Sequence, residues 1–253
     1  VLCEDTRVTG RLMSAFDLHV RLERCDENVM GEKIGQVLGR LAAGERVAFV
    51  SDAGMPGVSD PGQRLVDAAL DAGARVEVVP GPSAVTCALV ASGLASEHFF
   101  FEGFLPRRRA AQLARLAELA AIPGTLVVYE SPRRVAETLA NVAEVMPGRR
   151  AALVRELTKL HEEVVRGRAP ELAASIAARE EVRGECVIVI AAPDVEELTV
   201  RRAEAAGPER TLEEEIAAGL AAGEPKSALA KRLSRAFGLP RAEVYDKVVA
   251  AAR

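Results

Sequence analysis

Short runs of β-branched residues alternate with stretches of helical periodicity along most of this chain, and that alternation limits the folds it can adopt. In the first half, the predicted strands are 46–52, 76–79 and 99–101, and the predicted helices are 61–72 and 83–92. Parallel strands need a crossover connection between them, usually a helix. The pattern therefore predicts an α/β fold built on a mostly parallel sheet with helices on its faces.

The second half repeats the alternation and then becomes wholly helical. Its predicted strands are 125–129, 151–155, 163–166 and 186–190, and its predicted helices are 113–120, 134–146, 170–178, 211–222, 226–236 and 241–252. We expect four parts along the chain: an N-terminal α/β domain (1–104), a second α/β domain (105–194), a charged linker (195–210) and a helical tail (211–253).

Composition excludes several classes of protein. Apolar residues make up 49% of the chain but aromatic residues only 4%, so the core must be aliphatic. The net charge of −4 supplies no overall positive field that would attract RNA or a membrane. The four cysteines lie far apart without a Cys-x-x-Cys pair, which argues against zinc and disulfides and favours a reducing cytoplasm. No apolar run is long enough to predict a transmembrane helix.

Two loops at the carboxyl ends of predicted strands have the composition of a ligand site. Ser51–Pro56 places a carboxylate and a glycine just past one strand, and Pro80–Ala84 follows the next. Ligands of open α/β sheets bind at these ends. Turn and capping chemistry explains either loop alone about as well, but two on successive strands favour a ligand. Neither the dinucleotide nor the nucleotide-triphosphate glycine fingerprint occurs.

Three charged clusters also follow predicted strands: Glu4–Arg7, Tyr129–Pro132 and Arg155–Lys159. Each offers groups for acid–base chemistry or for positioning a phosphate. A surface ion-pair turn explains Glu4–Arg7 about as well, and for each of the other two clusters, taken alone, a structural role is favoured over a catalytic one. Phe104–Arg109 contains three consecutive arginines at a helix start, for which a solvated face is the default interpretation.

The tail has a more specific pattern. Its last two predicted helices are joined by a short turn that contains Gly238 and Pro240, which is typical of a helix-turn-helix. Residues 224–253 hold seven Lys and Arg against three acidic residues, a net charge of +4. This local positive charge predicts an RNA-binding tail. A small oligomerisation or lid module is the alternative.

Seven strings that lie in order along nearly the whole chain carry a family resemblance. They are EDTR (4–7), SDAGMPGVSDPG (51–62), PGPSA (80–84), FEGFLPRR (101–108), YESPRR (129–134), RELTKLHEEVVRG (155–167) and GECVIVI (184–190). Through them the chain resembles the tetrapyrrole methylase superfamily and, within it, the bacterial enzymes that 2′-O-methylate a cytidine in the decoding centre of 16S rRNA. The chain departs from the family pattern at three places. Cys25–Val29 replaces a His-Glu-His-Asn-Glu run, and Met55 replaces a threonine. At the start of the chain, we expect the family's first strand to be missing.

The resemblance implies two α/β domains with S-adenosylmethionine bound in the cleft between them, a homodimer, and 16S rRNA in the 30S subunit as the partner. No metal is expected, because His19, His98 and His161 share no metal-ligand spacing. The family's contacts to the methyl donor fall on Asp52, Ala53, Gly54, Pro82, Ser83, Ala84, Tyr129, Glu130, Leu157, Gly184 and Glu185.

Methyl transfer to a ribose hydroxyl requires alignment of the two reactants and an acceptor for the hydroxyl proton. The candidate catalytic residues are Glu4, Asp5, Arg7, Glu130, Glu156 and Lys159, with the base sought first at Glu4 or Asp5. Phosphate contacts are expected from Arg7, Arg107, Arg108 and Lys159. Two alternatives remain open: a methyltransferase of the same fold that acts on a tetrapyrrole or another small molecule, and a non-catalytic helix-turn-helix nucleic-acid binder. Affinity for the methyl donor separates the last from the other two.

Overall fold

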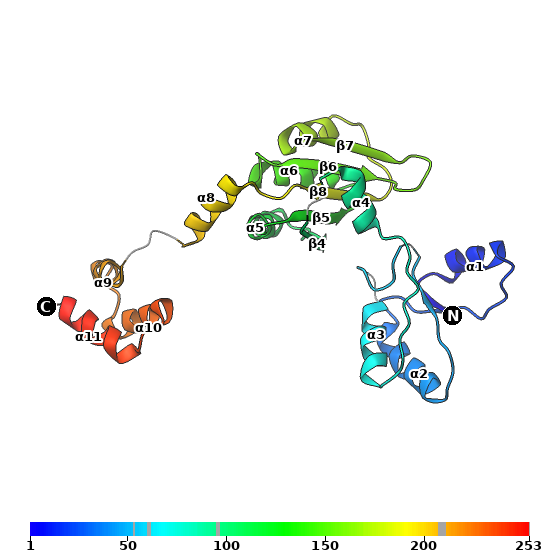
Figure 1. Cartoon of the computed structure of the whole chain (residues 1–253), viewed down its shortest axis with the longest axis horizontal. Helices are drawn as coiled ribbons and strands as arrows, with labels where there is room; N and C mark the ends of the chain where they lie inside the picture. The colour runs from blue at the N-terminus through cyan, green and yellow to red at the C-terminus, as the bar shows by residue number, and fades with distance from the viewer. Residues whose placement is uncertain (53, 60–61, 95–96, 207–210, 253) are drawn as a thin grey trace. The chain divides into compact units, whose positions relative to one another are not determined.

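The computed structural model describes residues 1–252 apart from 53, 60–61, 95–96 and 207–210, and it divides into two compact units (Figure 1). The first unit is Val1–Pro193 and the second is Asp194–Arg253. The described part of the first unit contains two separate sheets with their helices, and that of the second unit is helical.

A three-stranded parallel sheet begins the first unit, with the strand order β2-β1-β3. Its elements are β1 (Leu2–Cys3), α1 (Thr6–Ala15), β2 (Glu23–Arg24), α2 (Met30–Ala42), β3 (Phe49–Val50) and α3 (Gly62–Asp71). The buried core of this part consists of Leu2, Cys25, Met30, Val37 and Leu65. Because β1 and β3 are parallel neighbours, the residues that follow each of them lie side by side at one edge of the sheet.

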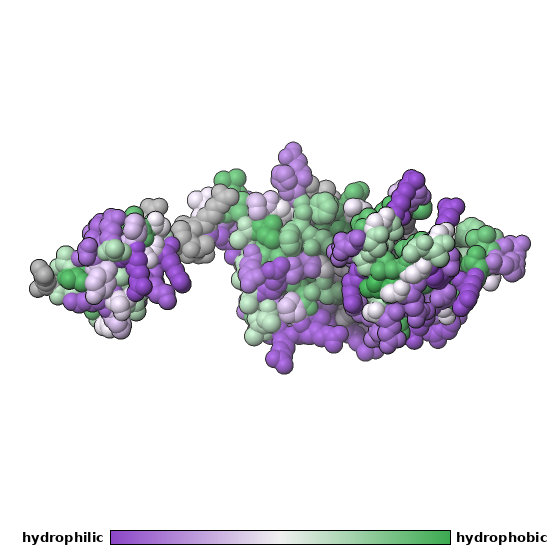
Figure 2. All heavy atoms as spheres, turned by 90° about the horizontal axis from the view of Figure 1, so that it is seen from below, coloured by the Kyte–Doolittle hydropathy of each residue, from purple (hydrophilic) through white to green (hydrophobic). Residues whose placement is uncertain are grey.

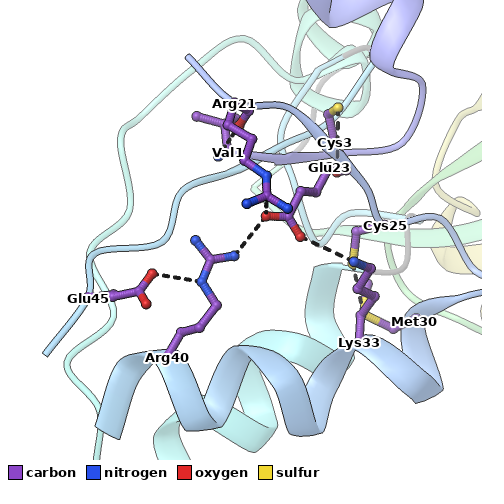
Figure 3. Close-up of polar contacts among 9 residues, drawn as sticks. All are labelled: Val1, Cys3, Arg21, Glu23, Cys25, Met30, Lys33, Arg40 and Glu45. Atoms are coloured by element: carbon purple, nitrogen blue, oxygen red, sulfur yellow. Dashed lines mark hydrogen bonds and ion pairs between the residues drawn. The ribbon is translucent and has the colours of Figure 1, made fainter. Parts of the chain in front are cut away.

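An ion-pair cluster fastens β2 to α2 (Figure 3). The Glu23 carboxylate lies 3.2 Å from Lys33 Nζ and 3.1 Å from Arg40 Nη1, and the hydrogen bond from Lys33 lowers the pKa of Glu23. On the neighbouring residues, the Cys25 thiol lies 3.7 Å from the Met30 sulfur, and burial raises the pKa of that thiol. Cys25 is therefore a core residue of this part of the fold.

A five-stranded sheet follows, with the order β4-β5-β8-β6-β7. Its strands are β4 (Phe99–Phe104), β5 (Thr125–Glu130), β6 (Arg150–Arg155), β7 (Glu163–Arg168) and β8 (Cys186–Ile190). Only β4 and β5 pair in parallel, and the other three pairings are antiparallel. The prediction of a mostly parallel sheet is wrong here, because the connection 156–162 is too short for a parallel crossover and β8 enters between β5 and β6 in the opposite direction.

Helices cover both faces of the five-stranded sheet. On one face the sheet shares a core with α5 (Arg109–Leu119), α6 (Val135–Val145) and α7 (Ala169–Ala177), and on the other with α4 (Ala84–Ser92). Along β5, Leu126 and Val128 belong to the first core and Val127 to the second, as the alternation of a strand requires. Strands buried on both faces are continuous apolar runs, which is why the sequence predicts β5, β6 and β8 well.

Other elements differ from the sequence prediction. Residues 76–79 form no strand, and Val78 and Val79 are exposed, because β-branched residues favour an extended backbone but pairing depends on a neighbour that the sequence does not reveal. Of the predicted strand 46–52, only Phe49–Val50 forms a strand, which is β3. The sequence pattern does not predict the helices α1 and α2. The strand β4, which lies before the predicted domain boundary at 104, pairs with β5 in the five-stranded sheet.

The second unit contains α8 (Val195–Ala206), α9 (Leu212–Ala221), α10 (Lys226–Phe237) and α11 (Arg241–Ala251). The last three confirm the predicted tail helices and enclose a core of Leu212, Ile216, Leu229, Ala230, Leu233, Val244 and Val248. Gly238 ends α10 in the left-handed conformation, with φ of +65°, which gives the predicted turn. The helix α8 occupies most of the segment predicted as a linker, 195–210, and the end of that segment lies outside the described residues.

Candidate functional site

A cavity of about 570 Å³ in the first unit collects loops from both sheets. Its lining comes from the ends of β1 and β3, the loop before α4, the end of β5, the loop after β6 and the residues that open β8. This volume lies within the range of about 300–1,000 Å³ that holds small-molecule ligands. The cavity is therefore the candidate active site.

Most of the residues expected to contact the methyl donor lie together in the cavity wall. These residues are Asp52, Gly54, Pro82, Ser83, Ala84, Tyr129, Glu130, Leu157, Gly184 and Glu185. Ala53 lies outside the described residues. Of the candidate catalytic residues, Glu4, Glu130 and Lys159 line the cavity, whereas Asp5, Arg7 and Glu156 do not.

Glu4 connects the loops that follow β1 and β3. Its Oε1 accepts hydrogen bonds from Ser51 Oγ at 2.8 Å and from the Asp52 amide at 3.1 Å. In return, the Asp5 amide donates to Asp52 Oδ1 at 3.2 Å. Within the described part of the chain, Glu4 Oε2 has no hydrogen-bond partner, so this oxygen remains available at the cavity wall.

Asp5 and Arg7 form a local pair at the start of α1. Asp5 caps the helix by accepting from the Arg7 amide at 2.8 Å, and the Arg7 guanidinium binds the same carboxylate at 2.6 Å. The hydrogen bonds from Arg7 hold the pKa of Asp5 well below its usual range. The structure therefore accounts for both side chains as helix capping and surface ion pairing.

Glu130 is fully buried at the end of β5, and its two oxygens are both occupied. Oε1 accepts from the Ser131 amide at 2.8 Å, and Oε2 accepts from Thr138 Oγ1 at 2.7 Å and lies 3.3 Å from Arg134 Nη2. A buried carboxylate that is satisfied in this way acts as a structural anchor for the loop after β5.

A second ionic group consists of Glu156, Lys159 and Glu185, of which Lys159 and Glu185 line the cavity. Glu156 Oε1 accepts from the Glu185 amide at 2.9 Å and from Lys159 Nζ at 3.1 Å, and Lys159 Nζ also lies 3.0 Å from Glu185 Oε2. The Glu185 amide and Lys159 lower the pKa of Glu156. Burial alone would lower the pKa of Lys159, but the carboxylates of Glu185 and Glu156 outweigh it and raise that pKa.

The backbone around this group is unusual. Glu156 and Thr158 have positive φ angles of 52° and 64°, and Gly184 has φ of +86°. A Cβ atom at Gly184 would overlap Glu156 Cγ and Cδ, so the carboxylate occupies space that only a glycine leaves free. Gly54, which also lines the cavity, has a left-handed φ of +78°, and among the described residues a Cβ atom there would meet only Pro82 O at 3.8 Å. Glycine therefore leaves room for a close backbone approach at Gly54, whereas at Gly184 the Glu156 side chain fills the space.

Sequence reasoning missed several residues of the wall. They include Met55, Ser59, Cys87, Phe104, Thr158 and Cys186. Phe104 stands inside a string that carries the family resemblance, and Cys87 lies one helical turn after Ser83, so both positions offered a signal. Burial raises the pKa of the Cys186 thiol to about 11, which keeps it protonated and unreactive near neutral pH.

Tyr129 lies at the centre of an aromatic group in the wall. Its ring contacts Phe101 and Phe104 edge-on, with centroid separations of 4.8 and 5.8 Å. Burial raises the pKa of its hydroxyl.

The four cysteines are free thiols. In the described part of the chain, no group of three or more His, Cys, Asp and Glu side chains could hold a metal ion, and no helix has the length and apolarity to cross a membrane.

Comparisons with known proteins agree with this architecture. The family model of the Tetrapyrrole (Corrin/Porphyrin) Methylases matches residues 1–173. The crystal structure of the methyltransferase CobJ is similar with a TM-score of 0.54 at 20% identity, covering 76% of this chain and 82% of that one. The cobalt precorrin-4 methyltransferase CbiF is similar with a TM-score of 0.55 at 17% identity, covering 75% and 82%. The family match identifies the chain as a methyltransferase, and the two structures show the same fold.

Relatives with higher identity narrow the comparison. The Ribosomal RNA small subunit methyltransferase I of Mycobacterium tuberculosis (strain ATCC 25618 / H37Rv) is 43% identical over 256 residues, which cover all of this chain and 86% of the relative. The protein with the same name from Mesorhizobium japonicum is 40% identical over 250 residues, covering 98% and 82%. The chain belongs to the tetrapyrrole methylase family, and its methyl donor is S-adenosylmethionine.

Proposed function

We propose that this protein transfers a methyl group from S-adenosylmethionine to the ribose 2′-hydroxyl of a cytidine in 16S rRNA of the 30S subunit. The cavity supports the proposal, because it gathers into one wall the residues expected to contact the donor. The relatives at 40–43% identity, which are named for methylation of small-subunit ribosomal RNA, support the choice of substrate. The cytoplasm is the compartment that this substrate implies.

The residues present fit the donor. The left-handed glycine at position 54 allows a ligand to approach the main chain, and the apolar face of Tyr129 and the side chain of Leu157 supply contacts for an adenine ring. The carboxylates of Asp52 and Glu185 offer acceptors for hydroxyl or ammonium donors. When bound, S-adenosylmethionine supplies an activated methyl group, so the protein has to position the acceptor hydroxyl and receive its proton.

Among the candidate bases, we select Glu4. Glu130 is saturated by inward contacts, whereas Asp5 and Glu156 lie outside the cavity wall and are held by cations. Glu4 lines the cavity, its Oε1 is fixed by two hydrogen bonds, and its Oε2 is open among the described residues. A positioned carboxylate of this kind contributes roughly 10²–10⁴-fold as a general base.

We propose that the helical tail, 211–253, binds RNA through α10 and the start of α11. Arg232 forms ion pairs with Glu215 and Glu224, and Lys247 pairs with Glu213. In the described chain no acidic partner is present for four other cations, Lys226, Lys231, Arg235 and Arg241. Figure 2 shows hydrophilic side chains over much of the visible surface of this unit. Unpaired cations on a solvent-facing helix are the usual contacts to RNA phosphates.

We also propose a homodimer, supported by the exposed face of α1. Val8 and Leu12 share one side of this helix, and Phe16, its C-cap residue, follows at the same spacing of four and is 68% exposed. A stripe of large apolar side chains on a helix surface is typical of an interface. The family resemblance suggests that a second copy of the chain packs against this stripe.

Transfer of a labelled methyl group tests the function. The purified protein is incubated with labelled S-adenosylmethionine and either 30S subunits that lack the modification or a tetrapyrrole acceptor. We expect label only in the ribosomal RNA. Label only in the tetrapyrrole would support the small-molecule alternative, and no donor binding by calorimetry would support the non-catalytic one. Reversing two tail charges, with Lys231→Glu and Arg235→Glu, should weaken 30S binding without changing donor affinity.

A further inference from the structure

Two segments at the edge of the cavity carry exposed side chains, among them Arg107 and Arg108, for which the sequence predicts phosphate contacts. The first segment contains Phe104, the last residue of β4, with Arg107 and Arg108 after it, and the second contains Arg133, which follows β5. All four residues are exposed. Phe104 itself lines the cavity, and so does Pro132, the chain neighbour of Arg133. We call these four residues the rim patch.

A buried anchor holds the two segments together. Arg134 Nη2 donates to the carbonyl oxygens of Leu105 at 3.2 Å and Pro106 at 3.0 Å, and the same nitrogen lies 3.3 Å from the buried Glu130 carboxylate. One guanidinium therefore binds the backbone of the first segment and the anchor of the second. The rim patch is presented on a fixed support rather than on two independent segments.

The three arginines of the rim patch have no carboxylate partner within the described part of the chain. Their sequence neighbour Arg109 differs, because it forms an ion pair with Glu144 at 2.5 Å. Arg107 and Arg108 also precede the first turn of α5, which has no acidic residue, so they lie at the helix end where cations are disfavoured. The patch thus concentrates positive charge that an external anion would stabilise.

Phe104 adds an apolar surface beside these charges. Its residue is 59% exposed although one edge of the ring packs against Tyr129. An aromatic ring that is fixed on one side and open on the other is a stacking platform for a nucleic-acid base. Stacking needs a base that is not paired in a duplex, and so does entry of a whole nucleotide into the cavity.

We propose that the rim patch binds single-stranded RNA beside the target nucleotide, with Phe104 stacking on a base and Arg107, Arg108 and Arg133 holding the flanking phosphates. The inference rests on the proposed function and names the protein contacts that it requires. A duplex, whose bases are not available to Phe104, should bind this patch less well than a single strand.

The test measures RNA affinity directly, without methyl transfer. Fluorescence anisotropy is recorded with a labelled single-stranded RNA of about 12 nucleotides over a salt series. The triple variant Arg107→Ala, Arg108→Ala, Arg133→Ala should bind at least about tenfold more weakly at low salt, and its slope of log affinity against log salt should be shallower by about 2, since each phosphate contact in a single strand contributes about 0.7. The control Arg109→Ala removes a neighbouring paired arginine and should change neither quantity.

The aromatic contact has its own matched control. Phe104→Leu should weaken RNA binding roughly 5- to 50-fold, because stacking is lost while an apolar side chain remains, and Phe104→Trp should restore it. Phe99→Leu changes an exposed phenylalanine at the other end of β4 and should have no effect. Calorimetric titration with S-adenosylmethionine and circular dichroism show whether each variant keeps its cavity and its fold.

Wild-type affinity and salt slope in the folded triple variant, or wild-type affinity in Phe104→Leu, would overturn the proposal even if the wild-type protein methylates 30S subunits. The reverse result is also distinguishable. If the variants lose RNA affinity while the wild-type protein methylates no ribosomal RNA, the rim patch stands and the proposed function fails. Equal binding of single-stranded and duplex RNA would overturn the stacking part of the proposal.

Discussion

Gly184, which precedes β8, lies against Glu156 in the loop after β6. Replacing Gly184 with alanine therefore tests the claim that this loop shapes the cavity. The glycine has φ of +86°, and a Cβ atom there would overlap Glu156 Cγ and Cδ. A side chain in the left-handed region costs about 1–2 kcal/mol. The Glu156 carboxylate must also move away from the Glu185 amide and from Lys159, so both contacts are lost.

The backbone strain alone corresponds to about 5- to 30-fold in donor affinity if donor binding has to restore the loop, and the displaced Glu156 contacts add to this loss. Isothermal titration of Gly184→Ala with S-adenosylmethionine measures the loss. Gly73→Ala is the matched control for backbone strain, because Gly73 has φ of +73°, a Cβ atom there would meet no other atom within 4 Å, and the residue does not line the cavity. We expect the control to lower the melting temperature without weakening donor binding.

A double variant separates the effect of atomic overlap with Glu156 from the effect of backbone strain at position 184. Glu156→Ala removes the atoms that a methyl group at 184 would meet, so adding Gly184→Ala to Glu156→Ala should cost less donor affinity than adding it to the wild-type protein. Equal costs in the two backgrounds would show that overlap plays no part. Wild-type donor affinity in Gly184→Ala would refute the role of this loop in the site.

Three further predictions address the base, the dimer and the response to pH. Glu4→Gln should lower single-turnover methyl transfer by roughly 10²-fold with little change in donor affinity, and a wild-type rate would remove Glu4 as the base. Leu12→Glu with Phe16→Glu should convert a dimer to a monomer in sedimentation equilibrium, whereas an unchanged mass would place the interface elsewhere. Glu163 accepts a hydrogen bond from Arg179 at 2.8 Å, and this contact lowers the pKa of Glu163 to about 2. The ion pair therefore stabilises the fold fully above the ordinary pKa near 4.5, and this stabilisation is lost as the pH falls through 2. Glu163→Gln should therefore cost about 1–2 kcal/mol of unfolding free energy at pH 7 and only a small part of that near pH 2, and an equal cost at both pH values would contradict this assignment.

The predictable part of the fold is the part determined by local pattern. The strands β5, β6 and β8 are apolar on both faces, and the tail helices have clear caps and turns, so sequence alone locates them. The order and direction of strands depend on contacts between distant segments. The insertion of β8 between β5 and β6, and the unpaired state of 76–79, could not be derived from local pattern for that reason.

The residues of the site also divide into those that local sequence predicts and those that depend on contacts between distant segments. The loops at strand ends are predictable because glycine, proline and carboxylates after a strand are recognisable, and the family resemblance indicates the later loops. The sequence could not separate Glu4, which faces the cavity, from Asp5, whose carboxylate is held by Arg7. Glu130 is a candidate catalytic residue by sequence, but the side chains that saturate it come from later positions on the chain, Thr138 and Arg134.

The most direct test of the central claim is to identify the methylated nucleoside. The protein is incubated with S-adenosylmethionine and 30S subunits that lack the modification, the 16S rRNA is digested, and the nucleosides are analysed by mass spectrometry. We predict one additional 2′-O-methylcytidine per subunit, located in the decoding centre, with Glu4→Gln giving far less of it at the same time point. A methyl group on a base, on a nucleotide elsewhere in the RNA, or on no RNA at all would contradict the account.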